Sequence, residues 1–389
     1  MSERVARHVA ELPKSGIRKF FDIVAQSKDI VSLGVGEPDF DTPWHISSAA
    51  VTCLEDGGTH YTSNLGTPAL RQAIVRYLER RFAASFDWQH EVLVTVGVSE
   101  AIDLAIRAIC SPGDEVLYHE PCFVSYAPTV RLAHAVPVVV ETRVEDAFRL
   151  TVEALERKVT PRTKALLLNF PCNPTGATLD RGDMLAILEF VKRHDLLLLA
   201  DEVYSELNYT VSDDEQLISF TSFPEYRDRV ILLNGFSKSW AMTGYRLGYA
   251  CGPTDVIDAM MKIHQYGIMS APTLSQAAGV EAMDHGDRDV AHMRAEYRRR
   301  RDFLVPALNA LGLRTLMPQG AFYLFVDVRS TGMDDETFAL KLLKEHGVAC
   351  VPGSAFGRCG AGFVRMSYAT SMDKIRLAVS RIGRMLGKD

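Results

Sequence analysis

The chain has 389 residues, 47% of them hydrophobic and 24% charged, with a formal net charge of −6. This length and composition are typical of a globular protein with a sizeable core, arranged as one large and one smaller domain. The longest basic run, Arg298–Arg301, lies in a helical pattern and predicts a solvated helix face, so a nucleic-acid-binding surface is not expected.

The seven cysteines are scattered and include no Cys-x-x-Cys pair, which argues against a disulfide framework and against a zinc site. We therefore expect a reducing compartment and no bound metal. The N-terminus, Met1–Arg4, lacks the apolar core of a signal peptide, and no apolar run is long enough to span a bilayer. Together these features predict a cytoplasmic protein without a membrane segment.

The first forty residues combine a polar start with two short patterned segments. A helix is expected at about Ile17–Ala25, where the pattern is amphipathic. Val31–Phe40 has the pattern of a short strand that ends in glycine and a Gly/Pro turn.

From about residue 91, short apolar runs alternate with helical stretches such as Ser99–Ile109 and Asp183–Arg193. This alternation predicts an α/β domain of three layers, in which helices cover both faces of a mostly parallel seven-stranded sheet. In such sheets ligands bind at the carboxyl ends of the strands. The predicted strands are Glu91–Val96, Glu115–Tyr118, Val136–Val140, Lys164–Asn169, Leu196–Ala200, Val230–Leu233 and Leu247–Cys251.

A smaller α+β domain is predicted beyond a boundary near residues 270–290. It contains a long charged helix at about Arg288–Leu311, a strand at Ala321–Val328 and a helix at Glu336–Glu345. The predicted division is an N-terminal arm with part of the small domain (1–44), a large domain (45–280) and a C-terminal small domain (281–389).

Several chemically capable side chains directly follow predicted strands. Lys238 lies in a turn after an apolar strand, and Arg246 follows between Gly244 and Gly248. Such a lysine can form a Schiff base with a carbonyl cofactor, and such an arginine can bind a phosphate. Any isolated Lys/Arg pair is by default a pair of surface residues, so these residues alone leave the question open.

Two further positions point to the same edge of the sheet. Ser99 opens a helix after Gly97, where free backbone amides suit a phosphate, although Ser99 is equally a plain helix cap. Asp201 follows a run of leucines, and a carboxylate buried there needs a cationic partner.

The segment Ser237–Tyr249, Ser-Lys-x-x-Ala-Met-Thr-Gly-x-Arg-Leu-Gly-Tyr, resembles the lysine motif of the class I/II aminotransferases, pyridoxal 5′-phosphate (PLP) enzymes of fold type I. The family usually has tryptophan where this chain has Tyr245, and some relatives have a phosphate-binding hydroxyl where it has Gly235. Four other segments resemble family motifs in the family's order: Tyr61–Arg71, Asn173–Gly176, Asp201–Tyr204 and Phe363–Ala369.

The resemblance implies a cofactor site. In it Lys238 holds PLP as a Schiff base and moves a proton, Asp201 pairs with the protonated ring nitrogen, and Tyr204 hydrogen-bonds the ring oxygen. The other implied cofactor contacts are Phe123 stacked on the ring, Asn173 at the phenolic oxygen, and Val98, Ser99, Arg246 and Tyr61 at the phosphate. Whether Ser237 also reaches the phosphate stays open.

The resemblance also implies how a substrate is held. Arg365 and Gly36 would bind the α-carboxylate with Asn173, and Phe20 would lie near the side chain. Tyr61 would reach the cofactor phosphate of the other subunit, which predicts a homodimer.

The implied reaction is a ping-pong transamination from an L-amino acid to a 2-oxo acid such as 2-oxoglutarate. Segments that resemble the prokaryotic aromatic aminotransferases favour an aromatic donor, and serine at position 99 weakens the case for aspartate. The alternatives are an aspartate or N-acetyl-diaminopimelate aminotransferase, and a PLP-dependent C–S lyase on the same scaffold. A PLP-sensing transcription regulator and a relative that has lost its cofactor are disfavoured.

Overall fold

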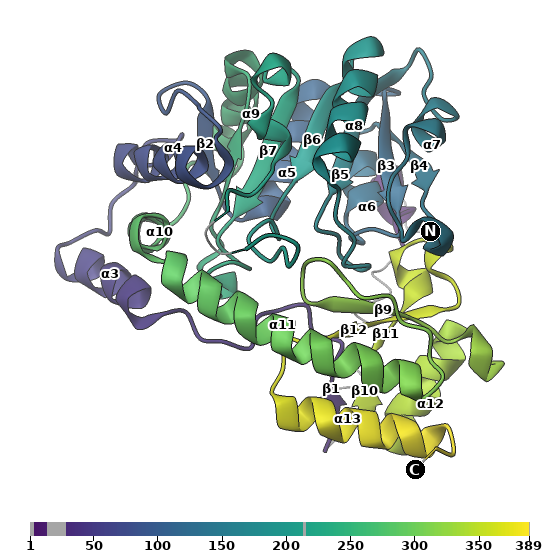
Figure 1. Ribbon diagram of the computed structural model, residues 1–389. Helices are drawn as coiled ribbons and strands as arrows, with labels where there is room; N and C mark the ends of the chain where they lie inside the picture. The colour runs from purple at the N-terminus through teal and green to yellow at the C-terminus, as the bar shows by residue number, and fades with distance from the viewer. Residues whose placement is uncertain (1–3, 14–28, 213–214, 389) are drawn as a thin grey trace.

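The computed structural model describes residues 4–13, 29–212 and 215–388. The expected helix Ile17–Ala25 and the candidate Phe20 therefore lie outside the described residues. The molecule has two parts, a large sheet with its helices and a smaller α+β part beneath it (Figure 1).

A seven-stranded sheet forms the centre of the larger part, in the order β2-β8-β7-β6-β5-β3-β4. Strand β8 runs antiparallel to both of its neighbours, and β7, β6, β5, β3 and β4 pair in parallel. The strands are β2 (Val92–Thr95), β3 (Glu115–Glu120), β4 (Val136–Glu141), β5 (Thr163–Asn169), β6 (Leu197–Asp201), β7 (Val230–Gly235) and β8 (Gly248–Cys251). The predicted fold and all seven predicted strands are confirmed.

Helices cover both faces of this sheet, so the side chains of its central strands, which point alternately to opposite sides, are buried on both. In β5, Ala165 and Leu167 pack into one core, whereas Leu166 and Leu168 pack into another. The first core is covered by α5 (Val98–Ile109), α6 (Tyr126–Leu132) and α9 (Thr254–Gly267). The opposite face is covered by α4 (Pro68–Phe82), α7 (Val152–Glu156), α8 (Arg181–Arg193) and α10 (Thr273–His285).

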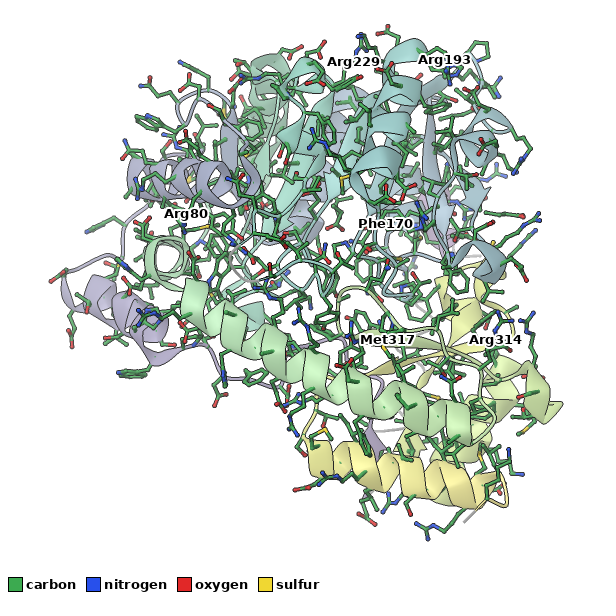
Figure 2. All side chains as sticks on the ribbon, viewed as in Figure 1. Arg80, Phe170, Arg193, Arg229, Arg314 and Met317 are labelled. Carbon is green, nitrogen blue, oxygen red and sulfur yellow. The ribbon has the colours of Figure 1, made fainter. Side chains whose placement is uncertain are left out.

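The parallel strands end at the edge of the sheet that faces the smaller part. Phe170, which directly follows β5, lies between the two parts, whereas Arg193 and Arg229 lie at the opposite rim (Figure 2). The residues that directly follow β3, β5, β6 and β7 therefore lie at the junction between the parts.

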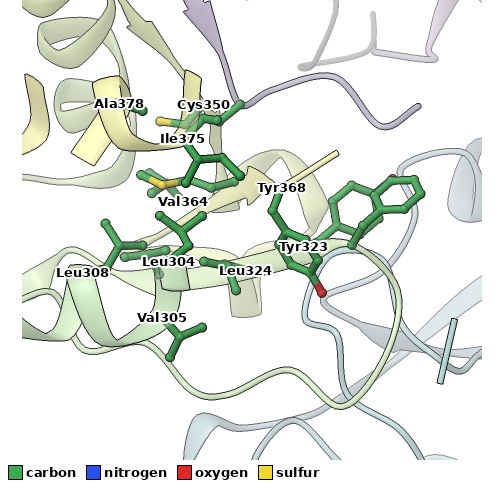
Figure 3. Packing of buried hydrophobic residues seen from close by; sticks show 14 of the residues in the cluster. Leu304, Val305, Leu308, Tyr323, Leu324, Cys350, Val364, Tyr368, Ile375 and Ala378 are labelled. Atoms are coloured by element: carbon green, nitrogen blue, oxygen red, sulfur yellow. The ribbon is translucent and has the colours of Figure 1, made fainter. Parts of the chain in front are cut away.

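The smaller part has a core between helices and an antiparallel sheet. Leu304 and Leu308 of α11 pack with Val364 of β12, Leu324 of β9 and Ile375 of α13 (Figure 3). The three-stranded sheet has the order β11-β12-β9, and β1 pairs with β10 beside it. The bounds are β1 (Val31–Ser32), α11 (Asp287–Ala310), β9 (Tyr323–Asp327), α12 (Asp335–His346), β10 (Val348–Ala349), β11 (Val351–Pro352), β12 (Phe363–Ser367) and α13 (Met372–Met385).

Two more helices of the N-terminal part of the chain pack against helices of the larger part. Helix α3 (Trp44–Glu55) lies along α10, and the short α1 (Arg7–Ala10) lies by α6. The predicted domain boundaries at residues 44 and 280 stay a prediction. Among the helices of residues 4–13, 29–212 and 215–388, none has both the length and the apolar character needed to cross a membrane.

The expectation that Arg298–Arg301 form a solvated face was wrong for part of the run. Arg299 is exposed, but Arg300 is buried and donates to Asp39 Oδ1 at 2.7 Å and to Glu296 Oε1 at 2.9 Å. Helix α11 lies over the core of the smaller part, so one side of its basic run faces inward and is neutralised there.

Candidate active site

A cavity of about 550 Å³ lies at the junction, at the carboxyl ends of the parallel strands. Its walls come from the first turns of α5, the segments that follow β3, β5, β6 and β7, and residues of the smaller part. The predicted site residues that line it are Gly36, Val98, Ser99, Phe123, Asn173, Asp201, Tyr204, Ser237, Lys238, Arg246 and Arg365. Tyr61 is not among the lining residues, and its side chain is 85% exposed on the surface.

Lys238 follows β7 and is half-buried in the cavity. Its Nζ donates to the carbonyl oxygen of Gly36 at 2.7 Å. Burial lowers the pKa of Lys238 to about 8, and the nearby cations Arg365 and Arg246 also lower it against the opposing charge of Glu37. A substantial fraction of this amine is therefore neutral, and nucleophilic, near physiological pH.

Asp201 ends β6 and is buried. Its carboxylate accepts hydrogen bonds from two neutral donors, the Tyr126 hydroxyl at 2.6 Å and the Val203 amide at 3.3 Å. Burial raises the pKa of Asp201 to about 6, although both hydrogen bonds oppose the shift. A carboxylate held in this way suits a cationic group placed in the cavity.

The start of α5 forms a cradle for an anion. Gly97 caps the helix with φ +78° and no side-chain cap bond, which leaves the first amides of the helix directed at the cavity. The Arg246 guanidinium lies against Gly97 so closely that a Cβ there would come within 2.7 Å of its Nη2. Helix amides and a guanidinium at one point are the groups that bind a phosphate.

Arg365 lies on β12 and is buried between aromatic rings, 4.5 Å from the Tyr323 ring centroid and 4.9 Å from that of Phe356. It donates to Asn173 Oδ1 at 2.9 Å and to the Gly34 carbonyl at 2.6 Å. Within the described chain its Nε makes no hydrogen bond. A buried guanidinium bound only to neutral acceptors is a site for a carboxylate.

The structure also brings in residues that the sequence analysis did not select. Asn169 joins two candidate residues, because its Nδ2 donates to the Asp201 carbonyl at 3.0 Å and its Oδ1 accepts from the Asn173 amide at 2.9 Å. Tyr126 binds Asp201, and Tyr323 donates to or accepts from the Tyr204 hydroxyl at 2.8 Å. Asn169 could have been found from its place at the end of a strand, but Tyr323 comes from the smaller part and carries no local signal.

Comparison with known proteins gives a consistent result. Residues 28–382 match the model of a family described as aminotransferase class I and II. The chain is 46% identical to the putative aminotransferase YugH of Bacillus subtilis, with all of both chains covered. It is 44% identical to an aspartate aminotransferase of Pyrococcus abyssi, covering 96% of this chain and 95% of the other. A crystal structure of an aromatic aminotransferase from Pyrococcus horikoshii superposes with a TM-score of 0.89 at 43% identity, covering 95% and 98%.

Proposed function

The chain belongs to the class I and II aminotransferases, transaminases of fold type I whose family uses PLP, and from this premise we propose which residues hold the cofactor and which substrate it takes. The proposal is transfer of the amino group of an L-amino acid, with an aromatic side chain favoured, to a 2-oxo acid such as 2-oxoglutarate. The observation that carries it is a buried carboxylate, Asp201, in the same cavity as a lysine whose pKa is about 8.

The cavity residues fit PLP group by group. Asp201 would pair with the ring nitrogen, Phe123 would stack on the ring, and the start of α5 with Arg246 would hold the phosphate. The bound cofactor supplies a carbonyl and an electron sink. Ser237 lines the same cavity and is a candidate for the phosphate. Val98 and Ser99, at the start of α5, would also bind the phosphate. Asn173 and Tyr204 would hydrogen-bond the phenolic oxygen of the ring.

The catalytic proton transfers are assigned to Lys238. In its neutral form the amine would accept the proton from the substrate Cα and then donate it to the C4′ carbon of the cofactor. Its bond to the Gly36 carbonyl holds the amine beside Gly36, a residue proposed to face the substrate carboxylate. Arg365 and Asn173 would bind that carboxylate and so orient the Cα–H bond toward Lys238.

Support for an aromatic donor comes from the lining of the cavity. Ile102, Phe123 and Tyr323 give it apolar walls, and Ser99 carries no positive charge that would attract a distal carboxylate. An aspartate or N-acetyl-diaminopimelate aminotransferase is the alternative among transaminases, and a C–S lyase is the alternative among reactions.

A homodimer is part of the proposal. Tyr61 is 85% exposed and absent from the cavity wall of its own chain, and the aromatic side chains of Trp44 and Tyr266 are 76% and 88% exposed. Tyrosine and tryptophan are enriched at protein interfaces, so their exposure here is consistent with a partner subunit. Tyr61 would then complete the phosphate site of the partner subunit.

The test is the absorption spectrum of the purified protein with PLP, recorded before and after addition of phenylalanine, aspartate or N-acetyl-diaminopimelate without an oxo acid. We expect the visible band of the lysine-bound cofactor to be replaced by a pyridoxamine band, fastest with phenylalanine. A visible band that persists with all three donors, together with release of pyruvate and ammonia from a sulfur amino acid, would favour the lyase. Absence of any visible band with PLP would refute the assignment of Lys238.

A further inference from the structure

We propose that Tyr323 is a positioning residue that couples the two ends of the active site: its ring holds the Arg365 guanidinium in place while its hydroxyl orients the Tyr204 hydroxyl toward the cofactor. This inference rests on the proposed function, because it concerns how this chain's residues act toward PLP and the substrate carboxylate.

The pairing of β9 and β12 explains the contact with Arg365. Tyr323 lies opposite Ser367 and Phe325 lies opposite Arg365, so Tyr323 and Arg365 are diagonal neighbours on the same face of the sheet. At this spacing an aromatic ring reaches a long neighbour, and the guanidinium carbon lies 4.5 Å from the Tyr323 ring centroid. A desolvated cation–π contact of this kind restricts where the guanidinium can lie.

The hydroxyl of Tyr323 serves a second contact. It lies 2.8 Å from the hydroxyl of Tyr204, and the two rings meet edge to face with centroids 5.8 Å apart. Tyr323 is 1% exposed and Tyr204 is 4% exposed. The two buried phenols therefore hydrogen-bond each other at the wall of the cavity.

Either hydroxyl could donate this hydrogen bond, and the proposal assigns the donor role to Tyr323. Burial raises the pKa of both tyrosines and the Arg365 cation opposes this rise in both. The guanidinium lies directly against the Tyr323 ring, which favours Tyr323 as the donor. Tyr323 donating to Tyr204 leaves the Tyr204 proton free to point at an acceptor in the cavity. A chain of two hydrogen bonds of this kind strengthens the second bond.

Gly36 shows how closely the Tyr323 hydroxyl is enclosed. A Cβ at Gly36 would come within 2.7 Å of that hydroxyl and 3.6 Å of Arg365 Nη1. Gly36 also accepts the hydrogen bond of Lys238. The Tyr323 hydroxyl thus lies where the lysine, the carboxylate site and the Tyr204 hydroxyl meet.

The experiment is a pH titration of the visible band of the holoenzyme. A hydrogen bond donated to the ring oxygen lowers the pKa of the lysine–cofactor linkage. Tyr323→Phe should therefore raise the titration midpoint by roughly 0.3 to 0.5 unit, and Tyr204→Phe should raise it further. In the double variant, Tyr323→Phe should add no shift, because the hydroxyl through which it acts is gone.

The contact between the Tyr323 ring and Arg365 is tested by a second measurement, the dissociation constant of 3-phenylpropionate. This ligand has a carboxylate for Arg365 to bind but no amino group. Tyr323→Phe keeps the ring and should change this constant by less than about twofold, whereas Tyr323→Leu removes it and should weaken binding roughly tenfold. Tyr209→Phe is the matched control, because Tyr209 is a buried tyrosine of the same core whose hydroxyl donates to the Ala321 carbonyl outside the cavity. It should change neither readout.

Different results overturn different claims. An unchanged midpoint in Tyr323→Phe, or an equal shift in the Tyr204→Phe background, refutes the coupling and leaves the proposed function standing. Absence of a visible band in the wild-type protein refutes the proposed function and the coupling with it. Should Tyr323→Phe fail to fold, Tyr323→Leu also removes the hydroxyl, and its midpoint must rise for the coupling to hold.

Discussion

Lys238 owes its reactivity to where the chain places it. The amine lies in a cavity shared with two guanidinium groups, and burial together with these charges lowers its pKa to about 8. Glu37 opposes the shift, and its carboxylate is held at the cavity by the Thr243 hydroxyl. The lysine is consequently cationic at pH 6 and largely neutral at pH 9.

The first prediction concerns the rate at which the apoprotein attaches PLP covalently. Only the neutral amine attacks the carbonyl, so the rate should rise with pH and reach half of its maximum near pH 8. Stopped-flow absorbance at a series of pH values measures this. A rate that keeps rising to pH 10, as for an exposed lysine, would contradict the lowered pKa.

Asp201 is a residue whose burial costs stability in the absence of a cation. Its raised pKa means that the folded protein binds more protons than the unfolded chain between about pH 4 and pH 6. Stability of the apoprotein contributed by this group is therefore present below pH 4 and is lost as the pH rises through about 6.

The second prediction follows for Asp201→Asn. At pH 8 the apoprotein variant should be more stable than wild type, by up to about 3 kcal/mol. Asparagine removes the buried charge, its Oδ1 can still accept from the Val203 amide, and its Nδ2 can donate to the Tyr126 hydroxyl, which then accepts instead of donating. At pH 4 the difference should disappear. Urea unfolding with and without PLP tests this, and the cofactor should stabilise wild type more than the variant. Lower stability of the variant at pH 8 would contradict the argument.

At the scale of elements, the start of α5 depends on a backbone conformation that side chains rarely adopt. Gly97 has φ +78°, and Gly248 of the adjacent strand lies so close that a Cβ there would come within 2.6 Å of the Val98 nitrogen. Arg246 also has a positive φ of 50°. The cradle is therefore built from close backbone approach, and the cost of the strained arginine is borne by the surrounding packing.

The third prediction compares two glycines of similar φ. Gly97→Ala and Gly113→Ala (φ +92°) should each cost about 1 kcal/mol of stability. Only Gly97→Ala should also weaken PLP binding, roughly tenfold or more, because its Cβ displaces the Arg246 guanidinium, whereas nothing lies within 4 Å of a Cβ at Gly113. Thermal unfolding and PLP titration separate the two effects, and equal PLP affinities would show that the cradle tolerates a side chain.

At the scale of the whole molecule, the active site forms where two parts of the chain meet. The Lys238–Gly36 bond joins residues 202 positions apart, and the Arg365–Asn173 bond joins residues 192 apart. In each contact one residue comes from the smaller part, Gly36 or Arg365, and the other from the larger part, Lys238 or Asn173. Movement of one part against the other would therefore change the distance between the two residues of each pair.

The fourth prediction tests the proposed dimer. Tyr61→Phe should bind PLP roughly tenfold more weakly by losing a bond to the phosphate, and Lys238→Ala should form no covalent cofactor adduct. A purified hybrid dimer combines one Tyr61→Phe chain with one Lys238→Ala chain. If Tyr61 serves the partner subunit, the site that contains Lys238 receives the native Tyr61 of the other chain, so this one site has both native residues. We therefore expect PLP to bind covalently to the hybrid with wild-type affinity. Only weak covalent binding, as in Tyr61→Phe itself, would show that each chain completes its own site.

Local patterns determined much of this molecule. The leucines before Asp201, the alternating residues of β5 and the helical stretches between strands were sufficient to predict all seven strands of the large sheet. Parallel strands deliver the residues after them to one edge, so the clustering of Lys238, Asp201 and Asn173 could also be predicted. These inferences succeed because hydrophobic periodicity and the position of a residue after a strand can both be read from a few consecutive residues.

Only the tertiary structure decided what surrounds those residues. Tyr323 faces Arg365 because β9 and β12 pair in one register, and Arg300 is buried because of the side of α11 that meets the core. The two neutral donors of Asp201 and the closeness of Gly36 to Lys238 likewise depend on packing between distant segments. No local pattern encodes such contacts, because they depend on how whole elements pack together and exclude water.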